Sequence, residues 1–140
     1  MKNLKNGEVK QVIHAGDFAM GNIVEVLARF PDLEFKIARG NCDVNEEVLS
    51  ELRQLSNVEC EEILQFEIVS KKFAIAHRVQ DLQDIQNAEI YISGHTHIPQ
   101  VKNIHGKLFL NPGSLMDDGG YFLLDLETLD VQRKLFNENI

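Results

Sequence analysis

The chain has 140 residues, of which 44% are hydrophobic and 26% charged, a composition that excludes disordered, collagen-like and coiled-coil proteins and predicts a single domain over residues 1–140. Its 22 acidic and 14 basic residues give a net charge of -8, which is the wrong sign for general binding to nucleic acids or anionic membranes. The two cysteines are too few for a disulfide framework, and no apolar run approaches the roughly 18 residues of a membrane span, so we expect a cytoplasmic protein that contacts neither membranes nor nucleic acids.

Strands and helices alternate in the first half of the chain. Residues 9–15 are expected to form a strand, and residues 21–30 a helix that Pro31 ends. A second strand is expected at 33–38 and a second amphipathic helix at 45–55. Because both strands are apolar on both faces, this order predicts a mostly parallel sheet covered by helices.

The second half of the chain favours antiparallel pairs. A hairpin is expected from residues 63–69 and 73–76, then a short helix at 80–87 and a buried strand at 89–93. Two further hairpins pair residues 100–104 with 107–110, around His105-Gly106, and residues 121–126 with 131–136. The whole pattern predicts a mixed α/β architecture with two packed sheets and outer helices.

Four of the predicted strands end in side chains that can bind metals. In chain order they are His14 with Asp17, Asn41 with Asp43, His77, and His95 with His97. Loops that leave the carboxyl ends of strands in an α/β sheet converge on one crevice, so these side chains are expected to share a site. Imidazole nitrogens with carboxylate and amide oxygens suit manganese, iron, zinc or nickel better than calcium.

Each residue also has a purely structural interpretation. Asp17 alone is typical of a turn after a strand, and Asn41 with Asp43 is typical of a turn with a helix cap. His77 alone is typical of a hydrogen-bonded core histidine, and His105 of a hairpin turn. The recurrence of ligand-type residues at four strand ends favours the metal site.

Five segments together resemble the calcineurin-like metallophosphoesterases, and most closely the small bacterial and archaeal phosphodiesterase branch. They are 14–17 (HAGD), 40–43 (GNCD), His77, 94–97 (GHTH) and 111–114 (NPGS). The resemblance covers nearly the whole chain. It implies a four-layer α-β-β-α sandwich of two mixed sheets, and hydrolysis of a phosphodiester or phosphomonoester small molecule by a metal-activated hydroxide.

The resemblance also implies the residues of the site. The expected metal ligands, which are also the expected catalytic residues, are Asp17, Asn41, His77, His95 and His97. Asp17 matches a carboxylate that bridges two ions, and His97 matches a ligand of the second ion. The residues expected to support the ligands are His14, Cys42, Asp43 and Ser114. One or two divalent ions are expected per chain, with manganese as the first expectation and zinc, iron, nickel or magnesium as alternatives.

Two departures from the family pattern are visible. The family begins with a strand that ends in Asp-x-His, and this sequence has no such strand, so the fold is expected to be incomplete at its N-terminus. The family's His-Gly-His here is His77-Arg78-Val79. The second ion would keep only Asp17 and His97, so we expect impaired activity. Arg78 is a candidate to contact the substrate phosphate as a bidentate donor, and the alternative is an exposed arginine with no role at the site.

These departures leave other functions open. One alternative is a catalytically silent binding scaffold, since the retromer scaffold subunit resembles the same family. Another is a decayed gene product without activity. The strand at 9–15 would also lack its neighbour, so the chain is expected either to form a homo-oligomer through this exposed edge or to cover it with residues 1–8.

Overall fold

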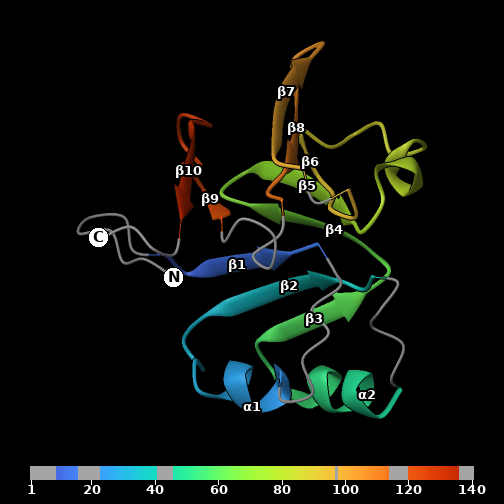
Figure 1. The fold of residues 1–140 in the computed structure, drawn as a ribbon, viewed down its shortest axis with the longest axis vertical. Coiled ribbons are helices and arrows are strands. Elements are labelled where there is room, and N and C mark those ends of the chain that lie inside the picture. Colours follow the sequence, from blue (N-terminus) through green and yellow to red (C-terminus); the bar gives the residue numbers. More distant parts are fainter. Residues whose placement is uncertain (1–8, 16–22, 41–45, 97, 114–119, 136–140) are drawn as a thin grey trace.

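The computed structural model describes residues 9–15, 23–40, 46–96, 98–113 and 120–135 (Figure 1). The elements in chain order are β1 (Gln11–His14), α1 (Ile23–Ala28), β2 (Glu34–Ala38), α2 (Glu46–Gln54), β3 (Val58–Glu61), β4 (Ile63–Ile68), β5 (Lys71–Ala76), the 3-10 helix η1 (Val79–Leu82), β6 (Ile90–Ile92), β7 (Gln100–Ile104), β8 (Lys107–Asn111), β9 (Gly120–Leu124) and β10 (Val131–Leu135). Among these residues no helix is long and apolar enough to cross a membrane.

The first sheet is parallel, in the order β1-β2-β3, as the β-α-β-α pattern predicts. Helices α1 and α2 cover one of its faces (Figure 1). Phe35 and Ile37 of β2 are buried in the same cluster as Leu49 and Leu52 of α2. Burial of these side chains removes apolar surface from water, and this holds the helices on the sheet.

Strand β3 was not predicted from the sequence. Only two of its side chains are apolar and buried, Val58 and Cys60, and they alternate with the exposed Glu59 and Glu61. The strand forms because its backbone pairs in parallel with β2, and Lys36 of β2 forms an ion pair with Glu59 across the ladder. Cross-strand pairs of this kind stabilise a sheet but leave little trace in the hydrophobic pattern.

The second sheet has five strands in the order β4-β5-β6-β8-β7. Strands β5, β6 and β8 run parallel, and β4 and β7 form the antiparallel edges. Its inner face packs on the first sheet in a core that contains Phe73, Ile75 and Ile90 together with Ala15 and Ala38. This mixed sheet confirms the predicted hairpins and the buried strand before Ser93.

One prediction is wrong at the outer face of this sheet, that of a helix at residues 80–87. In place of a helix at 80–87, the structure has the single 3-10 turn η1, which buries Leu82. The segment after η1 is instead held to the sheet by side chains that bind its backbone carbonyls. The Tyr91 hydroxyl donates to the Ile85 carbonyl over 2.6 Å, and the Lys107 ammonium donates to the Ala88 carbonyl over 3.0 Å.

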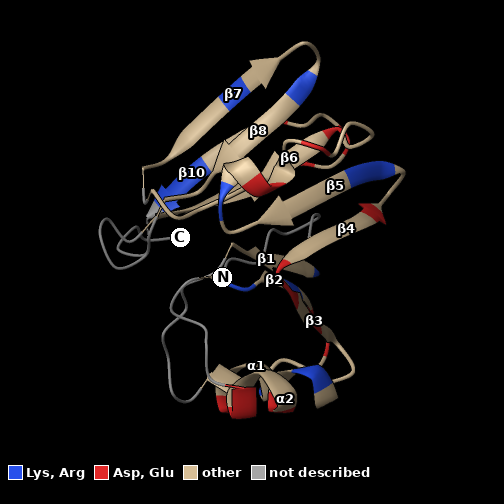
Figure 2. Ribbon diagram, turned by 90° about the vertical axis from the view of Figure 1, so that its right-hand side faces the viewer, with Lys and Arg blue, Asp and Glu red and all other residues tan. Residues whose placement is uncertain are grey.

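The two large sheets pack face to face, with α1 and α2 outside the three-stranded sheet (Figure 2). Among the described residues, the layer outside the five-stranded sheet is the 3-10 turn η1. The predicted mixed α/β sandwich of two packed sheets is therefore confirmed, with one addition. Strands β9 and β10 form a third, two-stranded sheet, and Phe122 and Leu124 of β9 pack against the core between the large sheets. β9 ends at Leu124, earlier than expected, because Asp125 Oδ1 accepts hydrogen bonds from the Glu127 and Thr128 amides and forms a turn.

Candidate metal centre

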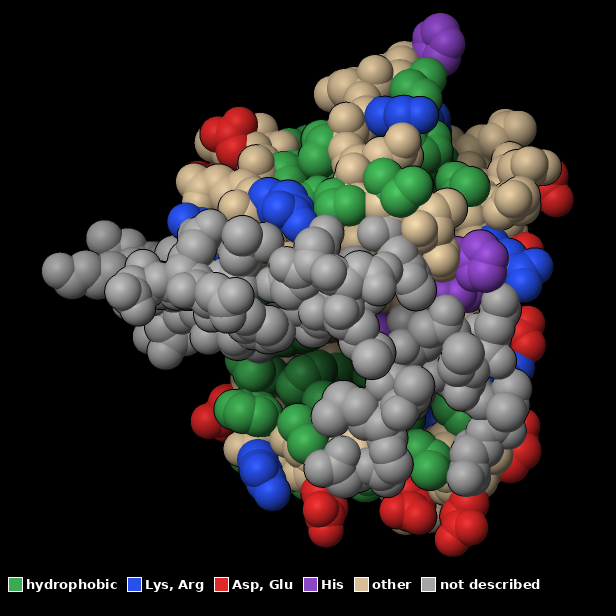
Figure 3. All heavy atoms as spheres, in the orientation of Figure 1, with side chains coloured by type: hydrophobic (Ala, Val, Ile, Leu, Met, Phe, Trp, Pro, Cys, Tyr) green, Lys and Arg blue, Asp and Glu red, His purple; other side chains and the backbone are tan. Residues whose placement is uncertain are grey.

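Two histidines meet where β5 and β6 end. His77 follows β5 and His95 lies beyond β6, and because these strands are parallel neighbours, their carboxyl ends lie together. His77 Nε2 is 3.0 Å from His95 Nδ1. The rings meet edge to face, with centroids 4.9 Å apart and planes inclined by 80°. Figure 3 shows histidine side chains gathered at one place on the surface, next to a basic side chain.

The other ring nitrogen of His77 is held by the first sheet. Its Nδ1 lies 2.7 Å from the carbonyl oxygen of Ala15, just beyond β1. A carbonyl only accepts, so Nδ1 carries the proton, and Nε2 is the nitrogen that faces His95. His77 is 4% exposed. A hydrogen bond from the second ring nitrogen to a backbone carbonyl is how proteins orient metal-binding histidines.

A glycine lets the two sheets approach at this point. The Gly94 amide donates to the His77 carbonyl over 2.9 Å. A Cβ atom at position 94 would lie 3.2 Å from Ala15 Cβ and 3.3 Å from its carbonyl oxygen, which is closer than ordinary contact. Any other residue at 94 would therefore push β1 away from the turn that carries His95.

The end of β8 supports the same turn. Asn111 is 6% exposed, and its Nδ2 atom donates to the Gly94 carbonyl over 3.1 Å and to Thr96 Oγ1 over 2.9 Å. Its Oδ1 atom accepts from the Gly113 amide over 2.9 Å. From the sequence, Asn111 was expected only as part of the NPGS segment, with no role of its own. Its position as an amide residue at the end of a predicted strand is the signal that could have indicated this role.

Of the other predicted site residues, two lie among those that the structure describes. His14 is the last residue of β1 and is partly buried, and Arg78 is exposed directly after His77. Outside the described residues lie Asp17, Asn41, Cys42, Asp43, His97 and Ser114. Within the described part of the chain, no three His, Cys, Asp or Glu side chains gather into a metal cluster. His105 lies in the turn between β7 and β8 with φ of 52°, as predicted.

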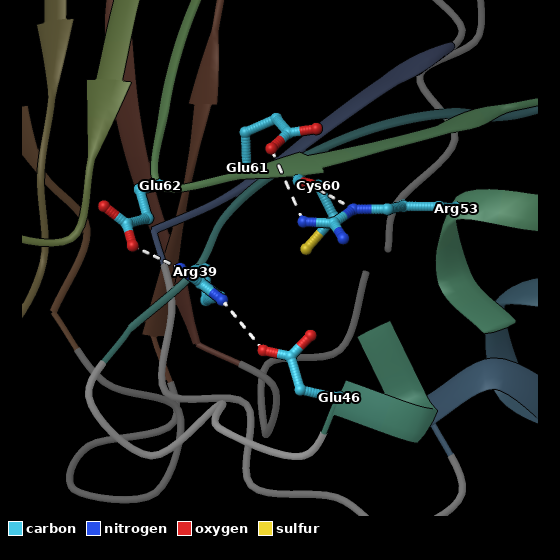
Figure 4. A network of polar contacts seen from close by, with 6 residues as sticks. All are labelled: Arg39, Glu46, Arg53, Cys60, Glu61 and Glu62. Atoms are coloured by element: carbon cyan, nitrogen blue, oxygen red, sulfur yellow. Dashed lines mark hydrogen bonds and ion pairs between the residues drawn. The ribbon is translucent and has the colours of Figure 1, made fainter. Parts of the chain in front are cut away.

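An ion-pair network lies beside the end of β2 (Figure 4). Arg39, directly after β2, pairs with Glu46 of α2 over 3.7 Å and with Glu62, which precedes β4. Arg39 and Glu46 flank residues 41–45 in the sequence, so their pair joins the two ends of the segment that carries Asn41 and Asp43. The acidic partners are well exposed, and such pairs typically contribute about 0 to 1 kcal/mol each.

A cavity of about 550 Å³ lies elsewhere, on the outer face of the five-stranded sheet. Its walls are mostly apolar and include Leu82, Ile85 and the stacked rings of Tyr91 and Phe109. The hydroxyl of Tyr91 and the ammonium of Lys107 already donate to backbone carbonyls there. Its other polar side chains are the uncharged Gln83 and Gln86, so the candidate metal site is at the two histidines and not in this cavity.

The two imidazoles fit a divalent transition metal. Metal–nitrogen bonds of about 2.1 Å that meet at a right angle place two nitrogens about 3.0 Å apart, and the separation of His77 Nε2 and His95 Nδ1 is 3.0 Å. Without an ion, His95 Nδ1 donates this hydrogen bond, because His77 Nε2 carries no proton. The proton must move from Nδ1 to Nε2 of the His95 ring before both facing nitrogens can bind one ion.

Comparisons with known proteins agree with this fold. The sequence model of the calcineurin-like phosphoesterase superfamily domain matches residues 1–129. The structure of an archaeal phosphodiesterase is similar over 91% of this chain and 84% of its own, with 24% identity and a TM-score of 0.75. A Thermotoga maritima protein is similar over 91% and 80%, with 26% identity and a TM-score of 0.60.

A further similar structure contains a metal. Vps29 from Entamoeba histolytica, complexed with zinc, is similar over 89% of this chain and 96% of its own, with 20% identity and a TM-score of 0.53. No curated protein matches the sequence.

Proposed function

Because the chain belongs to the calcineurin-like phosphoesterase superfamily, we propose that it is a metal-dependent phosphoesterase acting on small phosphodiesters or phosphomonoesters. The observation that carries this proposal is the meeting of His77 and His95 at 3.0 Å, with His77 oriented by the Ala15 carbonyl. An imidazole fixed through Nδ1 presents Nε2 as a ligand without further loss of side-chain freedom.

The ligand set that we propose joins both imidazoles with the predicted Asp17 and Asn41, and a second ion would use Asp17 and His97. Manganese is the proposed metal, because imidazole nitrogens together with carboxylate and amide oxygens form a ligand set that suits it. When bound, the metal supplies positive charge to the phosphoryl oxygens and lowers the pKa of a water molecule toward neutrality.

The chain's own residues position this chemistry. His77 is fixed by β1, whereas His95 lies on an exposed turn, so adjustment to the ion is expected on the His95 side. Arg78 follows His77 and is proposed to donate to the phosphate as a fork of two N–H groups. Since the second ion has only Asp17 and His97, we expect slow turnover.

The test is hydrolysis of bis(p-nitrophenyl) phosphate and p-nitrophenyl phosphate by protein stripped with a chelator. We expect slow hydrolysis that needs added manganese and is lost in His95→Ala. The matched control is His105→Ala, because His105 lies in the β7–β8 turn, and this variant should keep the wild-type rate. If neither ester is hydrolysed at any manganese concentration, the proposal fails and the silent binding scaffold becomes the better account.

A further inference from the structure

Asn111 ends β8 with its side chain turned to the loop that carries His95. All three of its hydrogen bonds lie within 3.1 Å, two donated by Nδ2 and one accepted by Oδ1. Its side chain is buried, so water does not compete for these bonds. A buried amide that uses both protons and its oxygen holds its partners in one arrangement.

The residues that Asn111 binds stand on either side of His95. It donates to the carbonyl of Gly94 and to the hydroxyl of Thr96. Between them His95 has φ of 68°, in the left-handed region. This conformation is unfavourable for a residue with a Cβ atom, so it persists where the surroundings fix it.

The far side of the loop is fixed by the turn after Asn111. Gly113 has φ of 81°, and a Cβ atom there would lie 2.8 Å from Pro99 Cγ. The backbone of Gly113 therefore packs directly on Pro99, which follows the His95 turn, and its amide is held by Asn111 Oδ1. One side chain thus links both ends of the segment from Gly94 to Pro99.

We propose that Asn111 is a positioning residue, which sets the backbone of the 94–96 turn so that His95 Nδ1 faces His77 Nε2. This role matters for function only if the proposed metal site exists, so the inference rests on the proposed function. The contact between the His77 and His95 rings, however, is present without metal. Asn111 does not touch the substrate or the ion. Its contribution is to fix where the second imidazole lies.

The test replaces Asn111 by aspartate, which has the same shape but would set an oxygen against the Gly94 carbonyl. The matched control is Asn103→Asp, because Asn103 is exposed on β7. Two measurements are made on folded protein: the NMR contact between the His77 and His95 rings without metal, and the manganese affinity by calorimetry. We expect Asn111→Asp to lose the contact between the two rings and to bind manganese at least tenfold more weakly. Asn103→Asp should change neither the contact nor the affinity.

A milder variant covers the case in which Asn111→Asp fails to fold. Thr96→Val removes one of the two acceptors and should weaken the ring contact and reduce manganese affinity several-fold, because Thr96 is exposed and the fold should remain. A folded Asn111→Asp, or failing that a Thr96→Val, that keeps both the ring contact and the affinity would overturn the inference. If wild-type protein binds no manganese, the proposed function fails, and the ring contact alone then decides the role of Asn111.

Discussion

The Nδ1 atom of His77 lies 2.7 Å from the carbonyl oxygen of Ala15, and this buried hydrogen bond joins the five-stranded sheet to the three-stranded one. The two residues are 62 positions apart in the sequence. One histidine therefore contributes to the packing of the sheets and to the candidate metal site. Substitution of His77 should therefore lower the stability of the fold, and substitutions that alter the packing of the two sheets should alter metal binding at the site.

The two contributions of His77 can be separated by substitution. Asparagine at 77 places its Nδ2 near the position of the histidine Nδ1, so His77→Asn can keep the bond to Ala15 but has no Nε2. We expect His77→Ala to lose about 1 to 3 kcal/mol of unfolding free energy in chelator, because a buried carbonyl is left unpaired. His77→Asn should recover part of this loss, and neither variant should respond to metal. Equal unfolding free energies for the two variants in urea would show that the bond adds nothing.

Gly94 is predicted to control the approach of the sheets. In Gly94→Ala the new Cβ meets Ala15 at 3.2 Å, and overpacking of this kind typically costs about 1 to 3 kcal/mol. Gly106→Ala is the control, because its φ of 79° makes the substitution strained while no atom lies within 4 Å of the new Cβ. Both variants should melt earlier, but only Gly94→Ala should lose the stabilisation by manganese. If both retain it in thermal melts, close approach at Gly94 does not matter to the site.

The predicted sheets follow from the hydrophobic pattern, but two elements do not. β3 has only Val58 and Cys60 as buried apolar residues, which is too little periodicity to indicate a strand. In place of the expected helix at 80–87 there is one 3-10 turn, and the segment after it is held by Tyr91 and Lys107 from neighbouring strands, which bind the Ile85 and Ala88 carbonyls. Such contacts between distant residues cannot be predicted from a local pattern.

The candidate site was also predicted only in part, because some of its contacts join residues that are distant in the sequence. Histidines that follow strands indicate which residues gather, so the meeting of His77 and His95 agrees with the expectation from the sequence. The partner that orients His77 is a backbone carbonyl of Ala15, and a carbonyl has no sequence signature. The support of the 94–96 turn by Asn111 depends equally on where β8 ends relative to β6.

Arg78 is predicted to bind the phosphate group of the substrate. A guanidinium one residue beyond a metal ligand can donate two parallel hydrogen bonds to a phosphoryl group. Arg78→Ala should weaken inhibition by phosphate or vanadate several-fold without moving the thermal melt, because Arg78 is exposed. Arg29→Ala, which removes an exposed arginine after α1, is the control and should change neither. Equal vanadate affinity in wild type and Arg78→Ala would dispose of this role.

The edge of β1 is predicted either to pair with a second copy of the chain or to be covered by residues 1–8. Among the described residues β1 pairs with β2 alone and lies at the edge of its sheet. An unpaired row of backbone groups on an edge strand is a template for another strand. We expect slow amide exchange from Gln11 to Ile13, and light scattering distinguishes a dimer from a monomer whose edge is covered. A monomer in which these amides exchange quickly would contradict the prediction.

The most direct test of the account is a metal titration of chelator-stripped protein, followed by calorimetry and thermal unfolding, for wild type and His77→Asn. We predict that wild type binds manganese. At 100 times the dissociation constant the ion should raise the unfolding free energy by about 2.7 kcal/mol, while His77→Asn should show neither binding nor stabilisation. Wild-type protein whose melt does not move with manganese or zinc, or a His77→Asn variant that binds as tightly as wild type, would contradict the account.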